Sequence, residues 1–202
     1  MPASASASAP AFVPARLWLV RHAQPLVAPG VCYGRLDLPA DMAATAASAQ
    51  ALAAALPAGM RLAHHSPLQR CEQLAQALHG LRPDLALKPD AQLQELDFGA
   101  WEGRTWDAIG RVPVDAWTAD FARHRPGGGE SLAGMLTRVA AALAAARAEA
   151  AASGNGVLWI THAGVARCVQ WLLQHGESAL PQADQWPVAA PGFGAWVLLD
   201  LG

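Results

Sequence analysis

Two short, unbroken apolar runs, far apart in the chain, each lead to a histidine. The run Leu17 to Val20 precedes Arg21 and His22, and the run Val157 to Ile160 precedes Thr161 and His162. Apolar runs of this length are typical of strands that are covered on both faces, as in parallel sheets. Ligands of such sheets bind at the carboxyl ends of the strands. The pattern therefore predicts that His22 and His162 share one site.

Helical segments separate the predicted strands. Helices are expected from Asp41 to Leu56, from an N-cap at Ser66 to Gly80, from an N-cap at Ser131 to just before Gly154, and from Val165 to His175. Further strands are expected at Arg61 to His65 and at Ala195 to Leu199. This alternation predicts an α/β fold, a three-layer α/β/α sandwich with a mainly parallel sheet.

The rest of the chain suggests one domain with two unusual segments. The 202 residues suit a single domain. Residues 1–14 are rich in alanine and serine and are predicted to be a disordered tail, which leaves 15–202 as the domain. Residues 103–129 contain Pro113, Pro126 and three consecutive glycines and are predicted to be irregular, with a small lid over the sheet at about 104–129.

Composition excludes several classes of partner. The formal net charge of −2 and the isoelectric point near 6.4 argue against nucleic acid or an anionic membrane as a partner. Three cysteines without a paired spacing predict neither a disulfide framework nor a thiolate zinc site. No apolar run approaches the roughly 20 residues that cross a bilayer. A cytoplasmic protein with a small phosphorylated substrate, no cofactor and a homodimeric assembly is the working expectation.

Several residues could together carry out phosphoryl transfer without a metal. This chemistry needs a nucleophile, cations around the phosphoryl oxygens and an acid for the leaving oxygen. His22 could attack phosphorus, while Arg21, Arg70 and His162 could bind the phosphoryl oxygens. Three neighbouring carboxylates, Glu95, Asp97 and Glu102, could each be the acid, and the residues alone leave that choice open.

Five segments resemble motifs of the histidine phosphatase superfamily, also called phosphoglycerate mutase-like. They are Leu19 to Gln24, Ser66 to Arg70, Leu93 to Gly103, Pro126 to Ser131 and Thr161 to Gly164. The resemblance implies the α/β fold, His22 as nucleophile, and a phosphate pocket of Arg21, Arg70 and His162. It also implies Glu95 as general acid and later as the base that activates water. Ala23 departs from the usual glycine, which raises the question of a shifted pocket edge.

The resemblance implies a metal-independent phosphomonoesterase that acts on a small metabolite. Short motifs around Cys32 to Gly34, Glu95 to Gly103 and Gly128 to Ser131 look most like the α-ribazole phosphatase group. Tyr33 and Arg104 are further candidates for substrate binding, and the nearby tryptophans Trp101, Trp106 and Trp117 could face an organic leaving group.

Three alternatives stay open. The chain could be a phosphoglycerate mutase, although it resembles shorter members of the superfamily. It could be a silent phosphate-binding protein, although such a protein would not need Glu95. A metallohydrolase is disfavoured, because the adjacent His64 and His65 would point to opposite faces of a strand.

Overall fold

The computed structural model describes residues 16–201, and a five-stranded sheet forms the centre of that part of the chain. The strands are β1 (Arg16–Arg21), β2 (Leu62–His65), β3 (Ala86–Pro89), β4 (Val157–Thr161) and β5 (Trp196–Asp200), in the spatial order β3-β2-β4-β1-β5. All neighbouring strands run parallel except β5, which is antiparallel to β1. The predicted mainly parallel sheet is confirmed.

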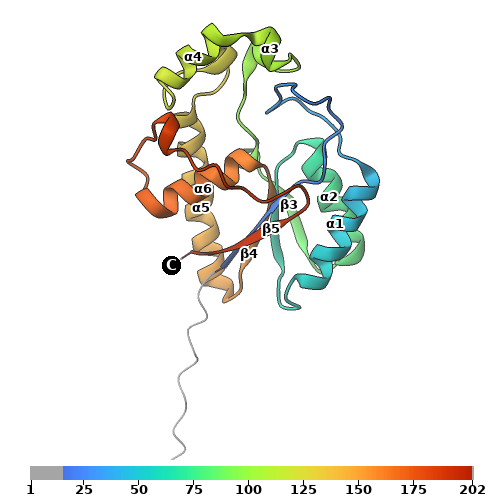
Figure 1. Cartoon of the computed structure of the whole chain (residues 1–202). Helices are drawn as coiled ribbons and strands as arrows, with labels where there is room; N and C mark the ends of the chain where they lie inside the picture. The colour runs from blue at the N-terminus through green and yellow to red at the C-terminus, as the bar shows by residue number, and fades with distance from the viewer. Residues whose placement is uncertain (1–15, 202) are drawn as a thin grey trace, which may run out of the picture.

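Helices cover both faces of the sheet (Figure 1). On one face lie α1 (Met42–Ala55) and α2 (Gln69–Leu81), and on the other lie α5 (Leu132–Ser153) and α6 (Ala163–His175). Alternate residues of β1 enter the two cores: Leu17 and Leu19 pack with α5 and α6, whereas Trp18 and Val20 pack with α1 and α2. The three-layer α/β/α prediction is therefore confirmed, and burial on both sides explains why β1 and β4 have no polar alternation.

The segment between the third strand and α5 lies beyond the carboxyl ends of the strands (Figure 1). It contains η1 (Ala91–Leu93), η2 (Gly99–Trp101), α3 (Trp106–Ile109), α4 (Arg111–Ala119) and η3 (Pro126–Gly128). The prediction of an irregular segment is thus wrong for 106–119. Pro113 is compatible with α4 because it stands in the first turn, where a helix needs no amide donor.

Three further differences from the sequence prediction concern β3, α6 and α2. β3 was not foreseen: it is a short, largely exposed edge strand without an apolar run. α6 begins at Ala163, two residues earlier than predicted. α2 begins at Gln69, and Ser66 is not its N-cap, because Leu68 has an extended backbone at φ −70° and ψ 136°. By contrast, Asp41 and Ser131 both cap helices with their side chains, the latter as predicted.

The predicted disordered tail, residues 1–14, lies outside the described residues. Between residues 16 and 201, no helix is long and apolar enough to cross a membrane.

Candidate active site

The two predicted histidines meet where β1 and β4 end. Arg21 is in register with Thr161, and the amide of His22 donates to the Thr161 carbonyl at 2.9 Å. The ring centroids of His22 and His162 are 5.2 Å apart. The parallel pairing of two buried strands therefore brings together residues that are separated by 140 positions in the sequence, as the apolar runs predict.

The His22 ring is held as a neutral imidazole. Its Nδ1 lies 2.7 Å from the carbonyl oxygen of Ala23, which can only accept, so Nδ1 carries the proton. Burial and the nearby Arg70 guanidinium lower the pKa of His22 to about 3. Nε2 thus carries a lone pair, and it makes no hydrogen bond to any residue within 16–201. A neutral imidazole in this state is ready to act as a nucleophile.

Ala23 fits the site without a shifted backbone. The residue is 1% exposed, and no non-glycine residue within 16–201 has a positive φ. Since this position does not need the left-handed conformation, a methyl group replaces the usual glycine hydrogen without backbone strain.

His22 should remain neutral well below the ordinary histidine range. Its pKa of about 3 lies below the ordinary value of 6.5, so the folded protein binds this proton less readily than the unfolded chain. The free energy of unfolding should therefore decrease through His22 as pH falls from about 6.5 toward 3, because only the unfolded chain readily binds this proton. We expect the histidine NMR resonance that is missing from His22→Asn to show no titration between pH 8 and 4. A midpoint near 6.5 would contradict this electrostatic environment.

Two arginines flank His22 with unused donors. Arg70 is fully buried, and its Nη1 and Nη2 donate to the carbonyls of Leu36 at 2.8 Å and Gly34 at 2.5 Å. Arg21 lies over the Phe193 ring at 3.7 Å. The Nε atoms of both arginines are buried and have no hydrogen-bond partner within residues 16–201. Because an unpaired buried donor is costly, these guanidinium groups are suited to an anion that supplies acceptors.

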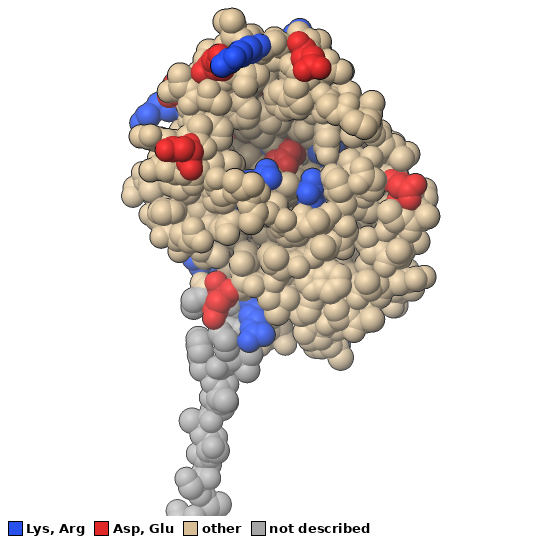
Figure 2. Space-filling view, in the orientation of Figure 1, with Lys and Arg blue, Asp and Glu red and all other residues tan. Residues whose placement is uncertain are grey.

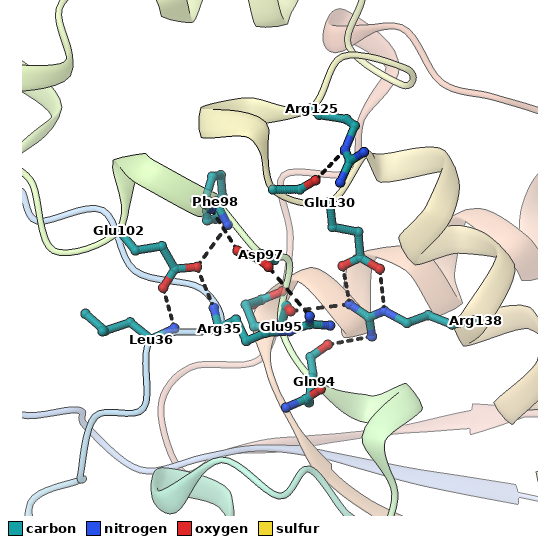
Figure 3. Close-up of polar contacts among 12 residues, drawn as sticks. Arg35, Leu36, Gln94, Glu95, Asp97, Phe98, Glu102, Arg125, Glu130 and Arg138 are labelled. Carbon is teal, nitrogen blue, oxygen red and sulfur yellow. Dashed lines mark hydrogen bonds and ion pairs between the residues drawn. The ribbon is translucent and has the colours of Figure 1, made fainter.

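The structure distinguishes among the three candidate carboxylates (Figure 3). Glu95 lines the same cavity as His22. Asp97 instead pairs with Arg35 at 3.6 Å and accepts from the Gly99 amide. Glu102 accepts from three backbone amides, those of Arg35, Leu36 and Phe98. Only Glu95 of the three is therefore placed to reach a substrate.

Arg138 holds the backbone that carries Glu95 (Figure 3). Its guanidinium donates to the carbonyls of Gln92 and Gln94 at 2.7 Å each and of Glu95 at 3.3 Å. It also forms a two-point ion pair with Glu130, both contacts being 2.8 Å. This explains the position of Glu130 in the motif before α5: the carboxylate orients the arginine that fixes the Glu95 segment.

The carboxylate of Glu95 is fixed by two amides. Oε1 accepts from Leu96 at 3.0 Å and Oε2 accepts from Gly164 at 2.9 Å. Gly164 lies in the first turn of α6, where amide donors are free and a negative charge is favoured. A Cβ atom on Gly164 would overlap Oε1 of Glu95. The glycine therefore provides the space that the carboxylate occupies.

We expect Gly164→Ala to lower activity without unfolding the protein. The added methyl group meets the flexible end of Glu95, which can turn aside, so the melting temperature should change by only a few degrees. Displacing a positioned acid should reduce kcat by roughly 10 to 100-fold. Gly80→Ala is the control, because nothing lies within 4 Å of the Cβ that it adds. Native-like kcat in Gly164→Ala would show that the Glu95 position does not matter.

His162 lies beside His22 but not on the cavity wall. The side chain is fully buried, and Nε2 shares a 2.8 Å hydrogen bond with the Ser66 hydroxyl. Ser66, predicted to be a helix cap, thus contacts the second histidine instead. Burial, with the nearby Arg70 and His22, lowers the pKa of His162 well below 6.5. The predicted contact of His162 with phosphate would require its ring to exchange this partner.

A cavity of about 570 Å³ is lined by Arg21, His22, Arg70 and Glu95 (Figure 2). Figure 2 shows the hollow, with acidic and basic side chains within it and mostly uncharged surface around it. Tyr33 lines the cavity, as predicted for a substrate contact. Arg104 does not: it is exposed, and its guanidinium donates to the Ala108 carbonyl at 2.5 Å. The position of Arg104 therefore does not support its predicted role in substrate binding.

One charged cavity residue was missed. Arg167, on α6, lines the cavity, and its Nε is buried without a partner, whereas Nη2 donates to the Val188 carbonyl at 3.3 Å. Arg167 follows the second histidine motif by three residues, but its contact with the segment around Val188 depends on the tertiary fold. A third guanidinium group is therefore available to substrate oxygens.

One family model matches most of the chain. The model of the histidine phosphatase superfamily (branch 1) matches residues 17–190. The chain belongs to this superfamily. The match spans both histidine motifs and the Glu95 segment, so the predicted family is confirmed and the protein is a phosphatase-type or mutase-type phosphoryl-transfer enzyme.

Solved structures of this histidine phosphatase fold extend over nearly the whole chain. A mycobacterial glucosyl-3-phosphoglycerate phosphatase is 26% identical, with a TM-score of 0.75, and the alignment covers 92% of this chain and 90% of that one. A protein from Thermus thermophilus, TTHB049, is 28% identical, with a TM-score of 0.68 and coverage of 92% and 93%. The comparison with curated proteins gives no match.

The adjacent histidines of β2 do not form a metal site with each other in this histidine phosphatase. His64 pairs with Glu149 at 2.8 Å, while Nδ1 of His65 lies 2.9 Å from the Ser66 carbonyl. Within residues 16–201, no group of three or more histidine, cysteine or acidic side chains is arranged to hold a metal ion.

Proposed function

We propose that the protein hydrolyses phosphate monoesters of small metabolites through a phosphohistidine on His22. The observation that carries the proposal is the state of His22. It is a neutral imidazole with Nδ1 fixed by the Ala23 carbonyl, and it lines a cavity that also contains Arg21, Arg70 and Glu95. Nucleophile, cations and acid are therefore present together.

In the first step, the lone pair of His22 Nε2 attacks phosphorus and the bond from phosphorus to the ester oxygen breaks. Arg21 and Arg70 bind the equatorial oxygens, where negative charge is concentrated in the transition state. A proton from Glu95 neutralises the leaving alkoxide. Glu95 can hold this proton while accepting two amide hydrogen bonds, because each carboxylate oxygen has two acceptor sites.

In the second step, Glu95 takes a proton from water, and the water oxygen attacks the phosphorus of the phosphohistidine. The phosphorus–nitrogen bond breaks, its electron pair returns to Nε2, and inorganic phosphate leaves. The cycle begins and ends with His22 neutral, which its lowered pKa favours. In the phosphohistidine between the two steps the ring keeps its Nδ1 proton and carries a formal positive charge beside the negative phosphoryl oxygens. Two displacements at the same phosphorus replace one slower hydrolysis.

For the substrate we propose α-ribazole phosphate as the first compound to test. The support is the resemblance of the segments around Cys32, Glu95 and Gly128 to the α-ribazole phosphatase group. Glucosyl-3-phosphoglycerate belongs in the same panel, because a structural relative acts on it.

The test measures phosphate release from a panel of monoesters in EDTA, with 3-phosphoglycerate included to detect isomerisation. The proposal expects phosphate release from at least one monoester, at a rate that exceeds any isomerisation of 3-phosphoglycerate. Rapid isomerisation without phosphate release would identify a mutase. Tight phosphate binding without any turnover would identify a silent binding protein.

A further inference from the structure

The cavity that contains Arg21 and Arg70 also has an aromatic lining. Rings from two separate segments line it: Trp106 of α3, Trp117 of α4, Phe121 after α4, and Trp186 after η4 (Ala183–Gln185). We call these four residues the aromatic wall. A phosphoryl group needs none of them, so the aromatic wall faces the remainder of the substrate.

The aromatic wall is built as a fixed surface. Trp117 and Phe121 stack with ring centroids 5.4 Å apart and an interplanar angle of 28°. Phe121 meets Trp186 at 6.0 Å, and this contact joins the two segments. Phe98 lies edge-on to both Trp106 and Trp117, at 5.9 and 5.7 Å. Mutually packed rings present flat faces without a large loss of side-chain entropy on binding.

Part of the aromatic wall is left open to water. Trp106 is 38% exposed, although its neighbours Trp101 and Ile109 are only 6% exposed. A large exposed apolar side chain within a concave site indicates a surface that a ligand covers. A small polar leaving group would leave this surface hydrated, whereas a planar ring would bury it.

The charged residues of the cavity are arranged to suit such a substrate. Arg21 and Arg70 lie near His22, and Arg167 is close enough to Arg21 to lower its pKa. Arg167 also donates to the carbonyl of Val188, two residues beyond Trp186. Arg167 is therefore available to polar atoms of a substrate that binds both the phosphate-binding arginines and the aromatic wall. The cavity of about 570 Å³ is within the usual range of roughly 300 to 1,000 Å³ for small-molecule sites.

We propose that the aromatic wall binds a planar aromatic ring in the leaving group, so that the substrates are phosphate monoesters of alcohols that carry such a ring. This inference rests on the proposed hydrolysis, and it is drawn from the cavity rather than from the motifs that suggest α-ribazole phosphate.

The test compares 3-phenylpropyl phosphate with butyl phosphate, since both release simple primary alcohols. Burying one ring against the aromatic wall should raise kcat/KM for the phenyl compound by at least about tenfold. Trp106→Ala should reduce that ratio severalfold. Trp196→Ala is the matched control, because Trp196 is a half-buried tryptophan on β5 that does not line the cavity. It should leave the ratio unchanged.

A binding measurement keeps the two proposals distinguishable. Calorimetry with 3-phenylpropyl phosphonate and butyl phosphonate, which cannot be hydrolysed, should show at least about tenfold tighter binding of the phenyl compound to the native protein. If the phenyl compound binds more tightly while no monoester is hydrolysed, the proposed function is wrong but the inference that the aromatic wall binds a ring is supported. Equal binding and equal kcat/KM for both compounds, or a ratio unaffected by Trp106→Ala, would overturn the inference.

Discussion

His22→Ala should lower kcat/KM for phosphate release by at least about 10⁴-fold, because removing a nucleophile abolishes the covalent route. The fold should survive: the ring is buried, but within residues 16–201 its one hydrogen bond is to the neighbouring Ala23 carbonyl. Circular dichroism should therefore match the native protein, while steady-state phosphate release falls to the background rate.

The matched control for this variant is His79→Ala. His79 is an exposed histidine in the last turn of α2 and does not line the cavity with His22. Its loss should change kcat/KM by less than about twofold. If His22→Ala retained a tenth of native activity, direct attack by water on the substrate would have to replace the phosphohistidine in the account.

Glu95→Gln should have the second largest effect, and the effect should depend on the leaving group. Loss of a general acid typically costs about 10² to 10⁴-fold. We expect a loss in this range of kcat/KM for an alkyl phosphate, whose alkoxide needs a proton as it leaves. For p-nitrophenyl phosphate the loss should be less than about tenfold, because nitrophenolate leaves without protonation.

The carboxylate two residues away provides the control for this experiment. Asp97→Asn weakens the ion pair with Arg35 but keeps an oxygen that can accept from the Gly99 amide. It should therefore leave the dependence on leaving group unchanged. An equal loss for both substrates in Glu95→Gln would mean that Glu95 positions the substrate rather than donating a proton.

Sequence reasoning succeeded where one local pattern fixes the structure. The runs ending at Val20 and Ile160 specify buried parallel strands, and the parallel pairing then brings His22 and His162 together. Ser131 caps its helix as predicted, because its side chain bonds an amide of the following turn. The motif resemblance added Glu95, and the structure places it on the cavity wall.

The missed features depend on contacts between distant segments. Ser66 bonds His162, which is 96 positions later, so its role could not be read from the helix that follows it. The contact of Arg167 with the Val188 carbonyl is likewise set by the fold, while Arg104 reaches only Ala108 in its own segment. β3 pairs through its backbone at an exposed edge, where apolar side chains are not required.

The central claim is the covalent intermediate on His22. The most direct measurement mixes the enzyme with substrate, quenches within milliseconds in alkaline denaturant, which preserves phosphohistidine, and locates the phosphoryl group by peptide mass spectrometry. The account predicts one phosphoryl group on the peptide that contains His22, absent in His22→Ala and accumulating in Glu95→Gln with p-nitrophenyl phosphate. Release of phosphate with no labelled peptide, or with the label on another residue, would contradict it.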